Sequence, residues 1–267
     1  MHTYTLTQLT PFTTADEEWE CRLRMVHDAQ EFLYASTYFL QYDRFGLSYL
    51  DALDKAHARG VDVTLLMDGF GENMIGVLMT AEETQALHNR LDESRRRGVK
   101  LIYYRVKTPL QRLLGSGMHT KIQLSEKGGA LFGSSNISGT SYAQWHEFTV
   151  FLEGNILPRL LQILESFGLT VPKEHYLRLE RIKPVEGTGQ KIGFLSHNPS
   201  QDFHPLNPLF LFRRNSLTDY LLRTFREAKE SIYITSFYFK PMPELLNALT
   251  DAAARGVDIR IIHSDRF

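Results

Sequence analysis

The chain has 267 residues, an apolar content of 43% and a formal net charge of −1 at pH 7. This length suffices for one large or two modest domains, and the composition excludes a disordered or fibrous protein. The balanced charge gives no sign of a nucleic-acid partner, and no apolar run reaches the roughly eighteen residues typical of a membrane-spanning helix.

Helical and strand patterns alternate through the first hundred residues. The helical stretches have apolar residues three or four positions apart, and the strands are short runs of aliphatic, aromatic and β-branched residues. After an N-terminal strand and loop, we expect helices at 15–30, 47–58 and 81–96, and strands at 31–39, 61–67 and 99–104. This alternation predicts an α/β layered domain with a largely parallel sheet.

A β-hairpin is expected next. Apolar and polar residues alternate over 118–124, and a polar turn with a glycine pair leads to a short apolar run at 130–132. Because strand side chains alternate between the two faces, His119 and Lys121 share one face.

Small polar residues follow the second strand of this hairpin. Gly133, Ser134 and Asn136 offer backbone N–H groups, a hydroxyl and an amide beside the imidazole of His119 and the ammonium of Lys121. Neutral and charged donors of this kind suit an anionic, tetrahedral group. The sequence therefore predicts a phosphate site here.

These residues resemble the signature of the phospholipase D superfamily, which reads H-x-K-x4-D-x6-G-S-x-N. The matching positions, all at the family's spacing, are His119, Lys121, Gly133, Ser134 and Asn136. Glu126 stands where the family has aspartate. Softer stretches, including the strand that ends at Asp68 and the segment 236–241, are similar to the bacterial cardiolipin synthase branch.

The resemblance implies a metal-free, two-step exchange of phosphodiesters. His119 is expected to attack phosphorus and form a phosphohistidine, with acid/base catalysis as its alternative role. Lys121 would neutralise the nonbridging oxygens, and Ser134 and Asn136 would donate hydrogen bonds to them. An acidic residue near the position of Glu147 hydrogen-bonds the catalytic imidazole in this family, while the aspartate at the position of Glu126 is mainly structural.

An internal repeat indicates a duplicated domain. Residues 228–239 echo 29–39, and residues 246–262 echo 50–66, including a shared Arg-Gly-Val-Asp. We expect a first phospholipase D-like domain at 1–183 and an incomplete second copy at 184–267, with a charged linker around 173–190. By the repeat spacing, a second motif would fall near position ~315 of a longer protein.

The function that the resemblance implies is that of a cardiolipin synthase-like phosphatidyltransferase. Phosphatidylglycerol would be both donor and acceptor, giving cardiolipin and glycerol, with no cofactor. The second motif would come from a longer chain or from a homodimer, and without it we expect this chain to be weakly active or inactive. Two alternatives remain: a phosphodiesterase or nuclease with water as acceptor, and, because of Glu126 and the absent second motif, a non-catalytic lipid-binding protein. For the phosphatidyltransferase, we expect no nucleic-acid partner.

Two segments are candidates for membrane contact. Residues 106–118 and 206–214 mix leucine or phenylalanine with basic residues, although a connection with buried leucines and a buried strand explain them equally well. A single cysteine, Cys21, excludes an internal disulfide and suits a reducing compartment. We therefore expect a cytoplasmic protein that contacts the inner membrane peripherally.

Overall fold

The computed structural model describes residues 2–74, 77–106, 117–182, 189–196 and 215–264. The chain forms two compact units, Met1–Phe194 and Leu195–Phe267. The boundary expected at 183/184 lies outside the described residues, as do nearly all of the candidate membrane-contact segments. Strand β8 (Gln190–Phe194) belongs to the first unit, because it pairs along β1 (His2–Pro11).

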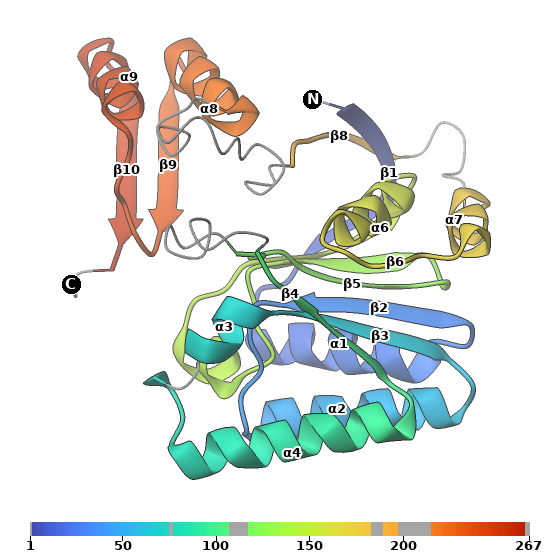
Figure 1. Cartoon of the computed structure of the whole chain (residues 1–267). Helices are drawn as coiled ribbons and strands as arrows, with labels where there is room; N and C mark the ends of the chain where they lie inside the picture. The colour runs from blue at the N-terminus through green and yellow to red at the C-terminus, as the bar shows by residue number, and fades with distance from the viewer. Residues whose placement is uncertain (1, 75–76, 107–116, 183–188, 197–214, 265–267) are drawn as a thin grey trace. The chain divides into compact units, whose positions relative to one another are not determined.

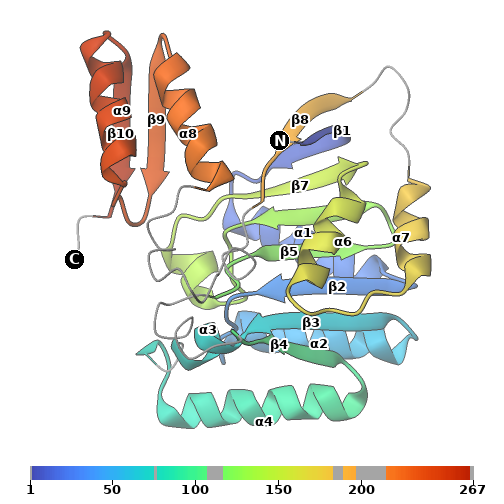
Figure 2. The same ribbon diagram turned by 45° about the horizontal axis from the view of Figure 1, so that its top comes forward.

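An eight-stranded mixed sheet forms the centre of the first unit, in the order β4-β3-β2-β5-β6-β7-β1-β8 (Figure 2). The six strands not yet given are β2 (Phe32–Thr37), β3 (Asp62–Asp68), β4 (Lys100–Tyr104), β5 (Lys121–Ser125), β6 (Gly129–Gly133) and β7 (Thr149–Gly154). The expected α/β layered fold with a mixed sheet is confirmed.

The expectation that this sheet is largely parallel needs correction. Only the pairings β2–β3 and β3–β4 are parallel, whereas the other five are antiparallel. Strand–helix–strand crossovers, which give parallel neighbours, build only the β2–β3–β4 part. The β5–β6 hairpin reverses the chain directly and therefore adds antiparallel neighbours.

Helices cover both faces of this sheet (Figure 1). One face carries α1 (Ala15–Asp28), α2 (Arg44–Ala58) and α4 (Ala81–Arg97), and the other carries α6 (Leu157–Ser166) and α7 (Lys173–Glu180). Each face has its own apolar core, since alternation along β2 directs Leu33 to the first and Phe32 to the second. Among the described helices, none is long and apolar enough to cross a membrane.

Local signals explain where these helices begin and end. The Thr14 hydroxyl accepts from the N–H of Glu17 at the start of α1, and Thr80 forms a reciprocal capping box with Glu83 at the start of α4. Gly98 ends α4 with a φ of 111°, a left-handed conformation that glycine adopts without strain. The predicted helices in this region therefore form within a few residues of their expected bounds.

The charged stretch at 173–190 is not simply an open linker. Its first part is helix α7, whose Leu179 is fully buried and whose His175 ring stacks on Phe32 with centroids 4.1 Å apart. The hydroxyl oxygen of Tyr34 lies 2.9 Å from Nδ1 of the same His175. These contacts fix the helix on the sheet, and the high charge of its outer face hid this in the sequence.

The second unit shows the expected repeat in atomic detail. Parallel strands β9 (Ser231–Ser236) and β10 (Asp258–His263) are accompanied by α8 (Ser216–Glu227) and α9 (Pro243–Ala254). In the first unit, the Arg59 guanidinium donates to two carbonyls at the end of α1. In the second, Arg255 makes the equivalent bonds at the end of α8. The shared Arg-Gly-Val-Asp therefore makes the same helix-to-strand turn twice.

Candidate active site

The β5–β6 hairpin brings the two halves of the sequence motif together. Lys121 lies opposite Gly133 in the antiparallel register, so the segment after Gly133 runs beside the residues that precede Lys121. A side chain at Gly133 would collide with Thr149 and with the carbonyl of Phe148 on β7, its Cβ falling 2.3 and 2.4 Å from them. Glycine is needed there because the three strands approach closely.

His119 and Lys121 are in direct contact. The Lys121 ammonium Nζ lies 3.0 Å from His119 Nδ1 and donates to the carbonyl oxygen of His119 at 3.1 Å. Lys121 is only 2% exposed, whereas His119 lies at the surface. The expected placement of both side chains on one face is therefore what the structure has.

Tyr38, which follows β2, contacts both of these residues. Its ring centroid is 4.6 Å from that of the His119 imidazole, and Lys121 Nζ is 5.6 Å from the same ring. The backbone N–H of Tyr38 also donates to Asn136 Oδ1 at 3.2 Å, beside the N–H of Phe39 at 3.4 Å. These bonds fix the orientation of the Asn136 amide, so that its Nδ2 donor points to the opposite side.

Glu147 is held by two serine hydroxyls. Ser134 Oγ donates to one carboxylate oxygen at 2.5 Å and Ser141 Oγ donates to the other at 2.7 Å. Ser141 Oγ also accepts from the N–H of Asn136. Glu147 thus joins the Ser134–Asn136 segment, and in this structure its hydrogen bonds go to hydroxyls. The expected bond to a catalytic imidazole stays a prediction.

Desolvation shifts the pKa values of both members of the central pair away from their ordinary values. Desolvation, and then the Lys121 charge, lower the pKa of His119 to about 4. Desolvation lowers the pKa of Lys121 to about 8, although the carboxylates of Glu147 and Asp68 act against this shift. At neutral pH the imidazole is therefore neutral while the ammonium is mostly still charged.

Asp68, at the end of β3, fixes the backbone next to His119. One carboxylate oxygen accepts from the N–H of Met118 at 2.6 Å, and the other accepts from those of Phe70 and Gly71. The side chain is 1% exposed, and desolvation raises its pKa even though these N–H groups oppose the change. On β2, the Ser36 hydroxyl donates to the carbonyl of Thr120 and accepts from the N–H of Ile122, which fixes the backbone that follows His119.

Glu126, the motif's acidic position, lies at the far end of β5. Its two carboxylate oxygens accept from the N–H groups of Gln30 (2.8 Å) and Phe32 (3.2 Å), where the chain enters β2. Seven residue steps of ~3.3 Å separate them, so Glu126 is roughly 23 Å along the chain from His119. Its contacts are those of a structural group that joins the hairpin turn to β2.

Tyr38, Asp68 and Ser141 are site residues whose roles the sequence analysis missed. Tyr38 and Asp68 directly follow or end two adjacent parallel strands, and the carboxyl ends of parallel strands share an edge of the sheet. That rule, applied to β2 and β3, was the signal that could have found them. Ser141 gave no such signal, because it belongs to a short π-helical turn at Thr140–Gln144.

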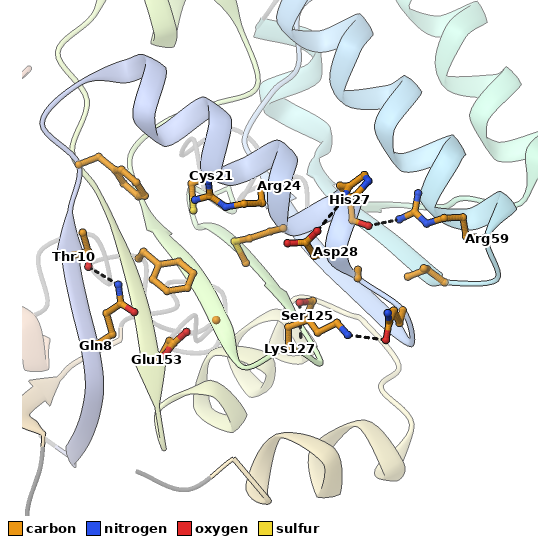
Figure 3. A pocket seen from close by; sticks show the side chains of 17 residues that line it. Gln8, Thr10, Cys21, Arg24, His27, Asp28, Arg59, Ser125, Lys127 and Glu153 are labelled. Carbon is orange, nitrogen blue, oxygen red and sulfur yellow. Dashed lines mark hydrogen bonds and ion pairs between the residues drawn. The ribbon is translucent and has the colours of Figure 1, made fainter. Parts of the chain in front are cut away.

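A separate groove of about 1050 Å³ lies on the α1 side of the sheet (Figure 3). It is lined from α1 by Cys21, Arg24 and Met25 and from the sheet by Ser125 and Phe151. None of the motif residues His119, Lys121, Ser134 or Asn136 lines it, so this hollow is not the predicted phosphate site. Within the described ranges, no three His, Cys, Asp or Glu side chains are grouped so as to hold a metal ion.

Residues 23–167 and 221–267 match the family described as cardiolipin synthase, PLD-like domain. The chain belongs to this family. The match covers the motif hairpin, the strand before Tyr38, the strand that ends at Asp68, and most of the described second unit. The resemblance inferred from His119, Lys121 and Gly133–Asn136 is thereby confirmed.

Several curated proteins are similar over nearly the whole chain. Cardiolipin synthase B of Salmonella typhimurium is 25% identical over 273 residues, which cover 96% of this chain and 59% of that protein. Cardiolipin synthase of Staphylococcus aureus (strain Mu50) is 23% identical over 261 residues, covering 94% and 49% respectively. The chain thus spans between half and six-tenths of the length of these relatives.

A solved structure shares the fold. The phosphatidylserine synthase of Haemophilus influenzae Rd KW20 superposes with a TM-score of 0.68 over 98% of this chain and 63% of its own, at 12% sequence identity. At this identity the likeness shows the fold alone. It nevertheless agrees with the mixed sheet and helical layers described above.

Proposed function

We propose that this protein is a phosphatidyltransferase that exchanges phosphodiesters of phospholipids through a phosphohistidine formed on His119. The observation that carries the proposal is the contact between a neutral imidazole and a buried ammonium beside the Gly133–Asn136 segment. A neutral imidazole has a lone pair for attack, and an ammonium next to it can neutralise a phosphodiester's charge.

The first half-reaction breaks one P–O bond and forms one P–N bond. An imidazole nitrogen of His119 attacks phosphorus, and the alcohol portion of the donor leaves as an alkoxide that takes a proton from a general acid. Lys121 and Asn136 donate to the nonbridging oxygens, and Ser134 joins them by turning its hydroxyl proton away from Glu147. In the second half-reaction an incoming alcohol loses its proton to the conjugate base of that acid and attacks phosphorus. The P–N bond then breaks and restores free His119.

The Lys121 contact determines which imidazole nitrogen is available. In this structure the ammonium faces Nδ1, so the proton of the neutral ring belongs on Nε2. An arriving phosphodiester would draw Lys121 to its oxygens and release Nδ1. Attack from Nε2 would then require the proton to move to Nδ1, where a carboxylate can hold it.

Phosphatidylglycerol is the substrate we assign to both half-reactions. As donor it loses glycerol, and as acceptor it supplies the hydroxyl that yields cardiolipin. The support is the name shared by the relatives above, together with the phosphate-binding chemistry of the site. We place the protein at a membrane surface on the cytoplasmic side, with the general acid supplied by a second motif, from the same polypeptide or from a second copy.

Vesicles of phosphatidylglycerol test this proposal. The expected products are cardiolipin and glycerol in equal amounts, formed equally well in EDTA, and absent for His119→Asn. Phosphatidic acid in place of cardiolipin would assign water as the acceptor and make the protein a phosphodiesterase. Binding of the vesicles without any turnover would support the non-catalytic alternative and contradict the proposal.

A further inference from the structure

A buried polar cluster lies beneath the phosphate-binding segment and joins it to helix α1. Glu18 and Arg22 are 4% and 2% exposed and form an ion pair of 2.9 Å one helical turn apart. The Tyr142 hydroxyl contacts both, donating to Glu18 at 3.0 Å and accepting from Arg22 Nε at 2.7 Å. The Glu18 and Arg22 charges are thus satisfied entirely inside the protein.

This cluster reaches both strands of the motif hairpin. Ser135, which stands between Ser134 and Asn136, donates from Oγ to the free oxygen of Glu18 at 2.6 Å. On the other strand, Gln123 donates from Nε2 to the backbone carbonyl of Arg22 at 2.8 Å. Helix α1 is therefore bonded to Gln123, two residues after Lys121, and to Ser135, which stands between Ser134 and Asn136.

Stability alone gives little reason for a buried ion pair at this place. Desolvating two charges costs about as much as their attraction returns, and well-packed apolar residues often serve equally well or better. What apolar side chains cannot do is hold Ser135 by a directed, charge-assisted hydrogen bond. Ser135 is 1% exposed, so its hydroxyl points into the protein while that of Ser134 faces the surface.

We propose that the Glu18–Arg22 pair is a positioning device for the phosphate-binding segment Gly133–Asn136. By holding Ser135 from the α1 side, the pair sets the positions of the Ser134 hydroxyl and of the Asn136 amide relative to His119. This inference rests on the proposed function and adds residues that lie outside the sequence motif. A donor displaced by about 1 Å can lower a rate up to ~100-fold, so a small shift of this segment would matter.

The test compares two double variants of the full chain. Glu18→Leu/Arg22→Leu removes the cluster, and Asp54→Leu/Arg90→Leu removes a partly buried ion pair of the same 2.9 Å length, which joins α2 to α4 away from the motif. Hydrolysis of bis(p-nitrophenyl) phosphate gives kcat and KM, and thermal unfolding gives Tm. We expect the first variant to lose about 10–100-fold in kcat with KM changed less than about threefold.

The matched variant separates positioning from folding. Asp54→Leu/Arg90→Leu should keep the wild-type kcat, and both double variants should unfold within about 4 °C of the wild type. If Glu18→Leu/Arg22→Leu does not fold, Ser135→Ala decides, because it removes only the link and keeps the ion pair. Wild-type kcat in the folded double variant or in Ser135→Ala would overturn the proposal.

A binding measurement keeps this inference distinct from the proposed function. Inorganic phosphate is titrated into each protein while the imidazole NMR signals of His119 are followed. Should the wild type show no turnover, the proposed function fails, and phosphate affinity then decides the positioning role. An affinity at least about threefold weaker without the ion pair supports it, and an unchanged affinity contradicts it.

Discussion

The ammonium of Lys121 lies 3.0 Å from Nδ1 of His119, and both groups have lowered pKa values. Their protonation states are therefore linked, and the reaction we propose requires a neutral imidazole and a charged ammonium. The pH interval in which this state dominates lies between about 4 and about 8.

The rate should follow a bell-shaped pH profile set by this pair. kcat/KM rises with pH as His119 loses its proton near an apparent pKa of about 4, and falls as Lys121 loses its proton near about 8. A soluble diester such as bis(p-nitrophenyl) phosphate keeps the ionisation of lipids out of the measurement. An alkaline limb near the ordinary lysine value of 10.5 would contradict the described environment of Lys121.

Glu147→Gln should move the alkaline limb to lower pH. The Glu147 carboxylate raises the pKa of Lys121 against the effect of desolvation, so removing this charge lowers that pKa below about 8. The amide keeps an acceptor for Ser134 or Ser141. The control is Glu153→Gln, because Glu153 lines the separate groove. This substitution should leave the alkaline limb at its wild-type pH. A limb that stays at the wild-type pH in Glu147→Gln is the contrary result.

Lys121→Met should stabilise the fold while abolishing activity. The folded-state pKa of about 8 lies below the ordinary 10.5, so the unfolded chain binds more protons between these values and the free energy of unfolding rises with pH there. Removing the desolvated charge should raise this free energy by about 1–3 kcal/mol at pH 7 and remove that part of the pH dependence.

Denaturant unfolding at pH 7 and pH 9 measures both effects. Lys100→Met is the matched control on β4 of the same sheet, because Lys100 is 58% exposed and pairs with Asp62 at the surface. Its substitution should change the free energy of unfolding by less than about 1 kcal/mol. A large loss of stability in Lys121→Met would mean that Lys121 contributes to the fold more than its burial costs.

Glu126→Ala should weaken the fold and leave the chemistry intact. The substitution leaves the partly buried N–H of Gln30 and the buried N–H of Phe32 without their acceptor, at a cost of about 1–3 kcal/mol. Lys127→Ala, at the neighbouring exposed position, is the control for the turn. Unfolding and kcat are measured on the same preparations; a kcat loss beyond about tenfold in folded Glu126→Ala would assign this residue a role at the site.

Much of this site could be predicted from the sequence because the hairpin is local. The alternation around His119 and Lys121 and the glycine before Ser134 determine a register that needs no distant contact. The positions of Glu18 and Arg22 depend on how α1 lies on the sheet, and nothing in their own helix indicates that Glu18 bonds to Ser135 more than one hundred residues away. Long-range contacts of this kind have no short sequence signature.

The same distinction explains the errors in the fold. The parallel β2–β3–β4 part follows from local strand–helix alternation, whereas the pairing of β1 between β7 and β8 joins the N-terminus to strands about 140 or more residues later. Helix α7 was hidden for a similar reason: its charged residues dominate its composition, and its stability comes from the contact of His175 with Phe32.

Trapping the covalent intermediate tests the central claim most directly. The protein is mixed with phosphatidylglycerol vesicles, quenched in alkali, digested, and analysed by mass spectrometry for a phosphatidyl adduct, or for the glycerophosphoryl adduct left when alkali removes the acyl chains, whose P–N bond survives alkali and is lost in acid. The account predicts this adduct on His119, and its absence in His119→Asn. An adduct on a different residue, or cardiolipin formation with no adduct on His119, would contradict it.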